Sequence, residues 1–171
     1  MDMKYFILLF VFTVGVLFSG CSKKSDVEYM DTAANSVKQN NIPQAVEAYE
    51  NLIREYPQSP KAPDAMFQLA TLYQNKLVKN ISEQESLNKA VEIFKNVFDK
   101  YPGSQIAPKS LFMAGFILAN DIHNFNQATT IFNLFLQKYP NNELAASAKE
   151  ELNNMGLSPE EILQKKKDSK S

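Results

Sequence analysis

The sequence predicts an all-α protein, a solenoid of about three helix hairpins followed by one capping helix. Two observations lead to this fold class. Tyr-Pro pairs at positions 56–57, 101–102 and 139–140 divide the chain into similar units. Within each unit, apolar residues return every three or four positions, the spacing that places side chains on one face of a helix. A helical unit repeated in this way buries its apolar face against the next copy.

The units agree residue by residue when they are aligned on their prolines. An alanine stands twelve residues before each proline, an aromatic residue eight before it, and another alanine five after it. In chain order these are Ala45, Ala90 and Ala128, then Tyr49, Phe94 and Phe132, then Ala62, Ala107 and Ala145. The residues before the proline form one stripe of a helix. We expect the small residues after it to let two helices approach closely.

Seven helices follow from this pattern. We expect them over residues 26–40, 42–56, 60–78, 84–100, 105–121, 125–138 and 142–154. Each proline ends the helix before it, because its ring cannot continue the backbone ladder and restricts the preceding residue. Ser59, Ser104 and Asn142 are then placed to cap the next helix. The first interval between prolines is longer than the second, which predicts a lengthened helix and a long loop around 76–87.

The first six helices form three hairpins, and the seventh caps the last pair. Ala145, Ala148 and Leu152 lie on one face of this seventh helix, and a C-cap glycine, Gly156, ends it. Ser158 is placed to start one more short helix. We therefore expect a repeat domain over residues 27–156 and a charged C-terminal tail over 157–171.

The N-terminus has the layout of a secretory signal peptide. Lys4 precedes an apolar run over residues 5–18, and the small residues Ser19 and Gly20 follow it. The run has about 14 residues, fewer than the roughly 20 that a membrane-spanning helix needs. An uncleaved N-terminal anchor is the alternative interpretation.

Residues 17–21, Leu-Phe-Ser-Gly-Cys, resemble the lipobox of bacterial lipoproteins. The resemblance implies that residues 1–20 are a lipoprotein signal peptide and that Cys21 is acylated. Residues 21–26 would then be a lipidated tether. Several acyl chains on one cysteine hold a protein to a bilayer durably, because each buried CH₂ contributes about 0.8 kcal/mol.

The second helix of each unit resembles that of the tetratricopeptide repeat, which carries an alanine, an aromatic residue four positions later and a closing proline. Ala45, Tyr49 and Pro57 match these positions, as do their equivalents in the later units. The resemblance implies a right-handed α-solenoid whose first helices line the concave side. The phrase Tyr-Pro-x-Ser-x-x-Ala-x-x-Ala over 56–65 is similar to the envelope branch of the family, which includes the BamD and CpoB (YbgF) types. The proline intervals of 45 and 38 residues depart from the family's period of roughly 34.

No catalytic, metal or cofactor site is predicted. The chain has one histidine and one cysteine, whereas zinc sites and most nucleophile–base sets combine several such residues. His123 falls in the expected turn of the third hairpin, and we interpret it as a solvated turn residue rather than a pH-sensitive or metal contact. A net charge of −1 argues against nucleic acid as a partner, since phosphate binding needs a basic face. No small-molecule substrate is expected.

What remains is a surface for binding proteins. If the first helices line a concave groove, its predicted members are Met30, Ala34, Phe67, Thr71, Gln74, Phe112, Phe116 and Asn120. Aromatic residues in an exposed groove are common anchors of a bound peptide or helix. Aromatic residues at helical spacing are, however, more often part of the core.

The resemblance to BamD-like lipoproteins implies a scaffold of the cell envelope, anchored in the outer membrane by its lipid and facing the periplasm. Its partners would be other envelope proteins or peptides, and its role the assembly of outer-membrane proteins. The alternative is a CpoB-like factor of envelope maintenance, linked to Tol-Pal and peptidoglycan. Relatives of that type usually carry a coiled-coil segment and no lipid, and no heptad segment is apparent here. A small envelope hydrolase is a third hypothesis, which no nucleophile–base set supports.

Overall fold

The computed structural model describes residues 23–168, in which the regular structure is entirely helical and no strand occurs. The helices are α2 (Asp26–Lys38), α3 (Ile42–Glu55), α4 (Ala62–Gln74), α5 (Glu83–Lys100), α6 (Ala107–Asn120), α7 (Phe125–Lys138), α8 (Ala145–Asn154) and α9 (Pro159–Asp168). The predicted all-α class is confirmed. The expected signal peptide and Cys21 lie outside the described residues. None of the helices from α2 to α9 is long and apolar enough to cross a membrane.

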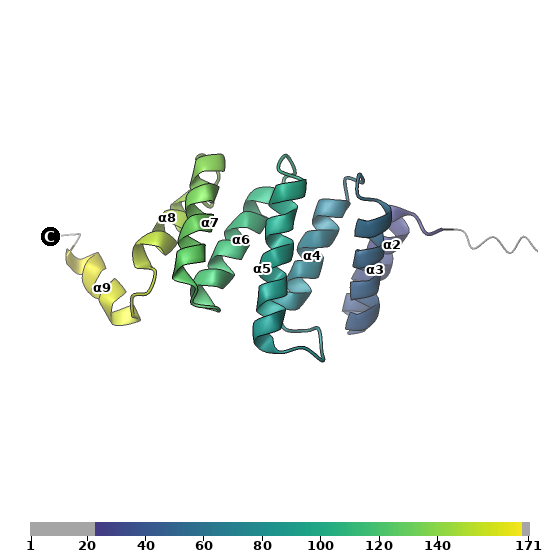
Figure 1. Cartoon of the computed structure of the whole chain (residues 1–171), viewed down its shortest axis with the longest axis horizontal. Helices are drawn as coiled ribbons and strands as arrows, with labels where there is room; N and C mark the ends of the chain where they lie inside the picture. The colour runs from purple at the N-terminus through teal and green to yellow at the C-terminus, as the bar shows by residue number, and fades with distance from the viewer. Residues whose placement is uncertain (1–22, 169–171) are drawn as a thin grey trace, which may run out of the picture.

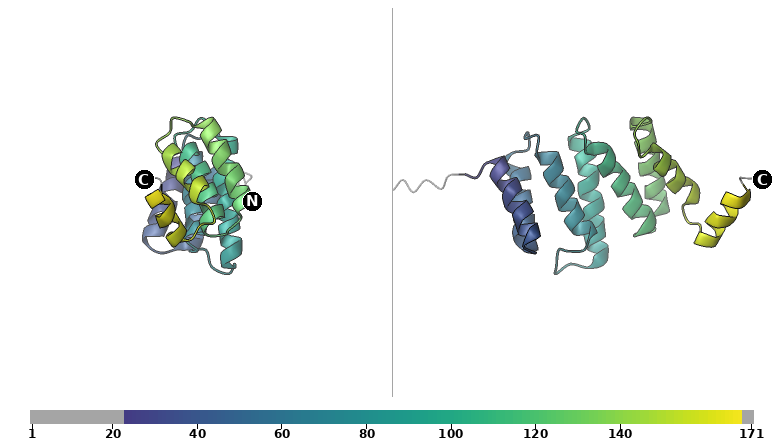
Figure 2. Two further views of the ribbon diagram at one scale, coloured as in Figure 1. Left: turned by 90° about the vertical axis from the view of Figure 1, so that its left-hand side faces the viewer. Right: turned by 180° about the vertical axis from the view of Figure 1, so that it is seen from behind.

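The helices stack in a single elongated row (Figure 1). Each helix from α2 to α7 packs against the next one in the chain. Three hairpins result, α2 with α3, α4 with α5, and α6 with α7, and α8 covers the last of them. The first helices of the hairpins form one layer and the second helices form the other (Figures 1 and 2). The stack is the tetratricopeptide-like arrangement that the repeated pattern predicts.

The residues aligned on the prolines form the core of this stack. Ala45, Ala90 and Ala128 are completely buried, and the aromatic residues four positions later are buried beside them. The alanines that follow the prolines are buried as well. A methyl group in these places lets neighbouring helices approach closely, and the large rings then fill the space between the layers.

The three Tyr-Pro turns have the same geometry. Tyr56, Tyr101 and Tyr139 end their helices with φ between −129° and −133° and ψ of 53–54°. Each tyrosine carbonyl accepts a hydrogen bond from the backbone N–H three residues later, at 2.9–3.1 Å. All three turns lie along one edge of the row, the upper edge in Figure 1. We call this the Tyr-Pro edge.

Helices α4, α6 and α8 begin later than expected, at residues 62, 107 and 145. The prediction that Ser59, Ser104 and Asn142 are N-caps is wrong. Ser59 and Asn142 instead accept the N–H two residues on, at 3.0 Å, within the turn. The capping positions fall on Lys61, Ile106 and Leu144, which make no side-chain cap. The chain therefore makes one extra turn before each of these three helices.

The long connection lies between α4 and α5. Helix α4 ends at Gln74 rather than at 78, because Lys76 adopts a left-handed φ of 56° and Leu77 N–H closes the turn on Leu72 O at 3.1 Å. Helix α5 is the lengthened one, with 18 residues against 14 in α3 and in α7. Ser86, in the added turn of α5, donates to Tyr73 O at 2.7 Å and ties the two helices together across the loop.

The C-terminal end contains the expected capping helix and one more helix. Ala145 and Ala148 of α8 are buried against the preceding hairpin. Gly156 has a φ of +78°, a conformation that glycine adopts without strain, and it separates α8 from α9. Ser158 caps α9 by accepting from Glu161 N–H at 3.3 Å. Helix α9 continues to Asp168, so most of the expected charged tail is helical.

Candidate protein-binding surface

The predicted groove residues all lie on the first-helix layer. Met30 and Ala34 belong to α2, in the first hairpin. Phe67, Thr71 and Gln74 lie on α4, and the remainder lie on α6. Asn120 is exposed, and every other member is partly exposed, so none is lost in the core. The surface that they share on α2, α4 and α6 is called here the first-helix face.

Phe67 lies between the core and a charged side chain. Its ring meets the buried ring of Phe94 edge-on, with centroids 5.2 Å apart and planes at 61°. On α6, Lys109 places its Nζ 5.1 Å from the centroid of Phe67. A cation at this distance is attracted to the face of the ring. Phe67 is thus a partly exposed apolar ring beneath the exposed Lys109.

Phe112 and Phe116 stand one turn apart on α6, and their rings are stacked at 6.3 Å with planes at 25°. Phe112 also touches the buried rings of Phe132 and Phe135 edge-on, at 5.6 Å and 6.0 Å. Phe112 therefore anchors the pair in the core. Phe116 extends the aromatic surface outward along the first-helix face.

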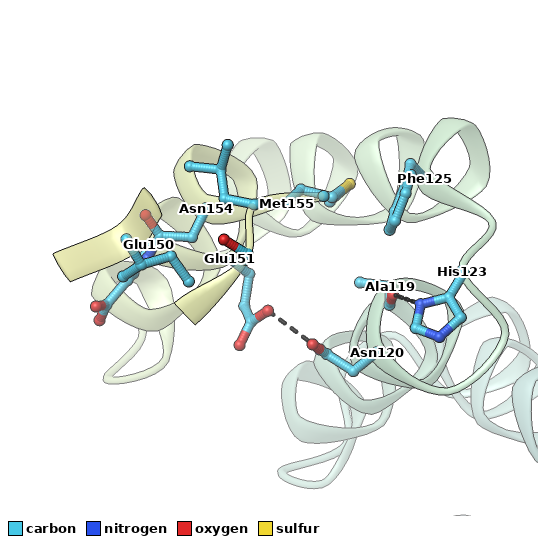
Figure 3. Close-up of a pocket in the computed structure, with 12 residues that line it drawn as sticks. Ala119, Asn120, His123, Phe125, Glu150, Glu151, Asn154 and Met155 are labelled. Atoms are coloured by element: carbon cyan, nitrogen blue, oxygen red, sulfur yellow. Dashed lines mark hydrogen bonds between the residues drawn. The ribbon is translucent and has the colours of Figure 1, made fainter. Parts of the chain in front are cut away.

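We call the partly exposed rings of Phe67, Phe112 and Phe116 the aromatic strip. Polar groups border it. Thr71 Oγ1 donates to the Phe67 carbonyl at 2.9 Å, so its hydroxyl is used within α4. Asn120 Nδ2 donates to Phe116 O at 3.2 Å and to Glu151 Oε2 at 3.1 Å. The second of these bonds joins α6 to α8 (Figure 3). The strip therefore ends, toward the C-terminus, at a polar bridge between two first-layer helices.

A pocket of about 650 Å³ opens beyond this bridge, between the α6–α7 turn and the segment that joins α8 to α9 (Figure 3). Among its lining residues are Asn120, His123, Phe125, Glu151 and Met155. Of the predicted groove residues, only Asn120 lies in it. The sequence did not indicate the pocket, because it depends on the direction that α9 takes after Gly156. The sequence feature related to the pocket is Gly156, which adopts a positive φ and lies next to the half-exposed ring of Phe125.

His123 lies in the turn between α6 and α7, and its side chain is exposed, as interpreted from the sequence. Its φ of 59° places it in the left-handed region. The ring Nδ1 is 3.3 Å from Ala119 O, and the ring lies edge-on to Phe125 at 6.1 Å. Within residues 23–168, no three His, Cys, Asp or Glu side chains form a cluster that could hold a metal ion.

The fold and this surface define a helical-repeat protein with an apolar, partly exposed strip on one layer. The model of the YfiO family, described as outer membrane lipoprotein, matches residues 17–117. This is more than half of the 171 residues, and the chain belongs to this family of outer membrane lipoproteins. The match takes in Cys21 and the helices from α2 through most of α6. No curated protein matches the chain.

Proposed function

We propose that this outer membrane lipoprotein is a protein-binding scaffold that faces the periplasm and assists in the assembly of outer-membrane proteins, as in BamD-like proteins. It binds an apolar, extended or helical segment of its partner along the first-helix face. Acyl chains on Cys21 hold it to the membrane. It catalyses no reaction and needs no cofactor.

The observation that carries this proposal is the set of three partly exposed rings on the first-helix layer. Phe67, Phe112 and Phe116 belong to two neighbouring hairpins and are backed by the core. Rings fixed in this way lose little conformational freedom when a partner covers them, which is why rigid aromatic residues serve as binding anchors. Lys109 can swing off Phe67 and meet an acidic residue of the partner.

The spacing of the helices supports a groove on this layer. Helix α6 packs against α4 and against α8, the first-layer helices on either side of it. In a curved stack, the helices on the inner side lie closer together than those on the outer side. The first-helix layer is therefore the concave side in the proposal.

Lipid attachment at Cys21 is supported by the family, whose members are outer membrane lipoproteins, and by a match that includes this residue. One acyl chain binds a membrane only marginally, and a second chain makes the attachment stable. Replacing Cys21 with alanine should release the protein from the membrane fraction. Retention of that variant in the membrane would show that the N-terminus is an uncleaved anchor.

Photocrosslinking from single positions tests the binding surface without unfolding the protein. A photoreactive phenylalanine analogue is placed at Gln74 or Phe116 of the full lipidated chain, and as a matched control at Glu92 or Lys95. These control residues are not buried and lie on α5, in the opposite layer. We expect outer-membrane assembly proteins or unfolded barrel precursors to be captured from the first pair and not from the second.

The outcomes separate the hypotheses. Capture of Tol-Pal or cell-wall synthesis proteins from the first-helix face would replace the assembly role with the CpoB-like one. Equal capture from both layers would show that the groove assignment is wrong. Phe116→Ala, which leaves the buried rings in place, should reduce capture, while Phe125→Ala, at an exposed ring of α7, should not.

A further inference from the structure

The residues that follow Cys21 are fixed to the first hairpin. Lys23 Nζ lies 3.5 Å from Glu55 Oε2 and 5.0 Å from the centroid of the Tyr56 ring. The carbonyl of Lys24 accepts a hydrogen bond from the Tyr56 hydroxyl at 2.8 Å. Tyr29 packs against Tyr56 with ring centroids 6.4 Å apart. The chain is therefore held from its first described residue, although Lys23 itself remains largely exposed.

The same contact recurs between the later hairpins. The Tyr101 hydroxyl donates to Pro57 O at 2.7 Å, and the Tyr139 hydroxyl donates to Pro102 O at 3.2 Å. In each case the tyrosine at the end of a second helix binds the Tyr-Pro turn of the preceding hairpin. Among the described residues, α2 and α3 are the first hairpin, and for Tyr56 the carbonyl of Lys24 takes the place of the proline carbonyl. The segment at Lys24 thus occupies the position that a Tyr-Pro turn takes for the two later tyrosines.

Further contacts fix the start of α2. Ser25 and Glu28 form a reciprocal capping box, with Ser25 N–H donating to Glu28 Oε2 at 2.7 Å. Asp26 accepts a short hydrogen bond from the Ser59 hydroxyl, in the first Tyr-Pro turn. The segment 23–26 is therefore bonded both to its own helix and to the 56–60 turn. A tether bonded in this way cannot swing freely about the domain.

From these contacts we infer that the first Tyr-Pro turn, residues 56–60, lies against the phospholipid headgroups of the membrane. The inference rests on the proposed acylation of Cys21. Only Ser22 separates that residue from Lys23, so the attachment point lies within two residue steps of Lys23, about 7 Å at full extension. Cys21 therefore cannot reach the bilayer unless the end of α3 and the 56–60 turn also come close to the bilayer.

The chemistry of the turn suits a headgroup layer. Residues 56–60 are Tyr-Pro-Gln-Ser-Pro and carry no charge themselves, and the two carboxylates beside them are bonded, Asp26 to Ser59 and Glu55 to Lys23. Lys23 and Lys24 lie beside the turn, and basic residues in such a place are attracted to an anionic leaflet. The start of α2 is at the Tyr-Pro edge, and the loop over 75–82 is at the opposite edge (Figure 1). The fixed tether thus turns one edge of the row toward the membrane at its N-terminal end.

Fluorescence quenching in vesicles tests this orientation. The full lipidated chain carries one added cysteine, Gln58→Cys in the turn or Gln84→Cys at the start of α5, and both positions are exposed. Acylated Cys21 does not react with the label. In vesicles of phosphatidylethanolamine and phosphatidylglycerol with a headgroup quencher, we expect at least twofold stronger quenching at Gln58 than at Gln84. Equal quenching at the two positions overturns the inference.

A second comparison tests the fixed tether. Tyr56→Phe combined with Lys23→Ala removes the contacts that Lys23 and the Tyr56 hydroxyl make and leaves the bond from Ser59 to Asp26, and the quenching difference should then shrink. Tyr101→Phe deletes the same hydroxyl one hairpin later and should leave the difference intact. Flotation of the protein together with the vesicles shows separately whether the chain is anchored in the membrane. If the wild-type chain does not float, the proposed acylation fails and the orientation with it, whereas flotation with equal quenching overturns the orientation alone.

Discussion

Gly115 shows how a single residue sets the distance between two helices. A Cβ at this position of α6 would lie 2.9 Å from Cε1 of Phe132, a ring of α7 that is completely buried. We expect Gly115→Ala to destabilise the protein. Overpacking costs about 1–3 kcal/mol, and the gain in helix propensity offsets about 1 kcal/mol of it. Thermal unfolding measures the difference.

Gly103 is the matched control for this substitution. It lies in a Tyr-Pro turn, where an added Cβ meets nothing within 4 Å. Gly103→Ala should therefore leave the melting temperature unchanged or raise it slightly, because it restricts the unfolded chain. A Gly115→Ala variant that melts together with Gly103→Ala would show that the α6–α7 contact can relax.

Asp26 links stability to pH. The hydrogen bond from the Ser59 hydroxyl lowers the pKa of Asp26 below its ordinary value of 3.8. The folded state thus favours the ionised carboxylate. The stability that this provides is fully present above the unfolded pKa and is lost as the pH falls through the folded pKa. We expect Asp26→Asn to reduce the loss of stability between about pH 5 and pH 3, measured as urea midpoints.

Asp31→Asn, at an exposed carboxylate of the same helix, removes the same charge away from the turn and is the control. The pKa of Glu28 is also lowered, by its bonds to Ser25, so part of the acid dependence should remain in Asp26→Asn. If Asp26→Asn follows the wild type across this range, the bond to Ser59 does not contribute to stability in solution.

At the level of single residues, the sequence predicted the core better than the turns. The alanine and aromatic positions could be found because burial repeats with the helix period, and all of them are buried. The capping residues were missed because Ser59 and Asn142 suit both an N-cap and a turn. Only the position of the next alanine against the preceding hairpin decides between these two, and that is a tertiary contact.

The two C-terminal helices differ in what they contribute to the stack. Helix α8 packs on α7 and buries Ala145 and Ala148, whereas α9 packs extensively on no other described helix. We expect a chain ending at Leu157 to melt within a few degrees of the full-length protein. A chain ending at Asn141 should lose much more stability, because it uncovers the apolar face of the last hairpin, and terminal caps protect such faces.

Circular dichroism melts of the three chains make this comparison. Helical content should fall with each truncation in proportion to the helix removed, so the melting temperature is the quantity that decides. Equal melting temperatures for the two truncations would contradict a capping role for α8. A large loss on removal of α9 alone would show that α9 is part of the folded stack.

The seven expected helices and their order followed from the sequence, while α9 lies in the expected tail and several helix ends differ. The sequence predicts a helix that ends at 78, whereas α4 ends at Gln74 and leaves the apolar residues Leu77 and Val78 beyond it. The structure uses both residues in the connection instead, where they pack partly buried against the core. Apolar periodicity cannot distinguish a helix from a loop that lies on the core. The first-helix face was predicted from the same pattern, and its role in binding stays a prediction.

The whole molecule depends on contacts between neighbouring hairpins, because a stack of this kind has no contacts between distant repeats. Three tyrosine hydroxyls connect neighbours along the Tyr-Pro edge, from Tyr56 to Lys24, from Tyr101 to Pro57 and from Tyr139 to Pro102. Each hydroxyl bond contributes about 0.5–1.5 kcal/mol. Together they bond the N-terminal segment and the three hairpins in series.

We expect the triple variant Tyr56→Phe, Tyr101→Phe, Tyr139→Phe to melt at a lower temperature and over a wider range than the wild type. The rings remain to pack, so the core is kept, but the hairpins lose coupling and unfold less cooperatively. Calorimetry shows this as a van't Hoff enthalpy that falls below the calorimetric one. Tyr49→Phe is the matched control, since phenylalanine already stands at the equivalent buried positions 94 and 132. If the triple variant unfolds as sharply as Tyr49→Phe, water replaces the three bonds without loss, and the packing of the rings alone couples the hairpins.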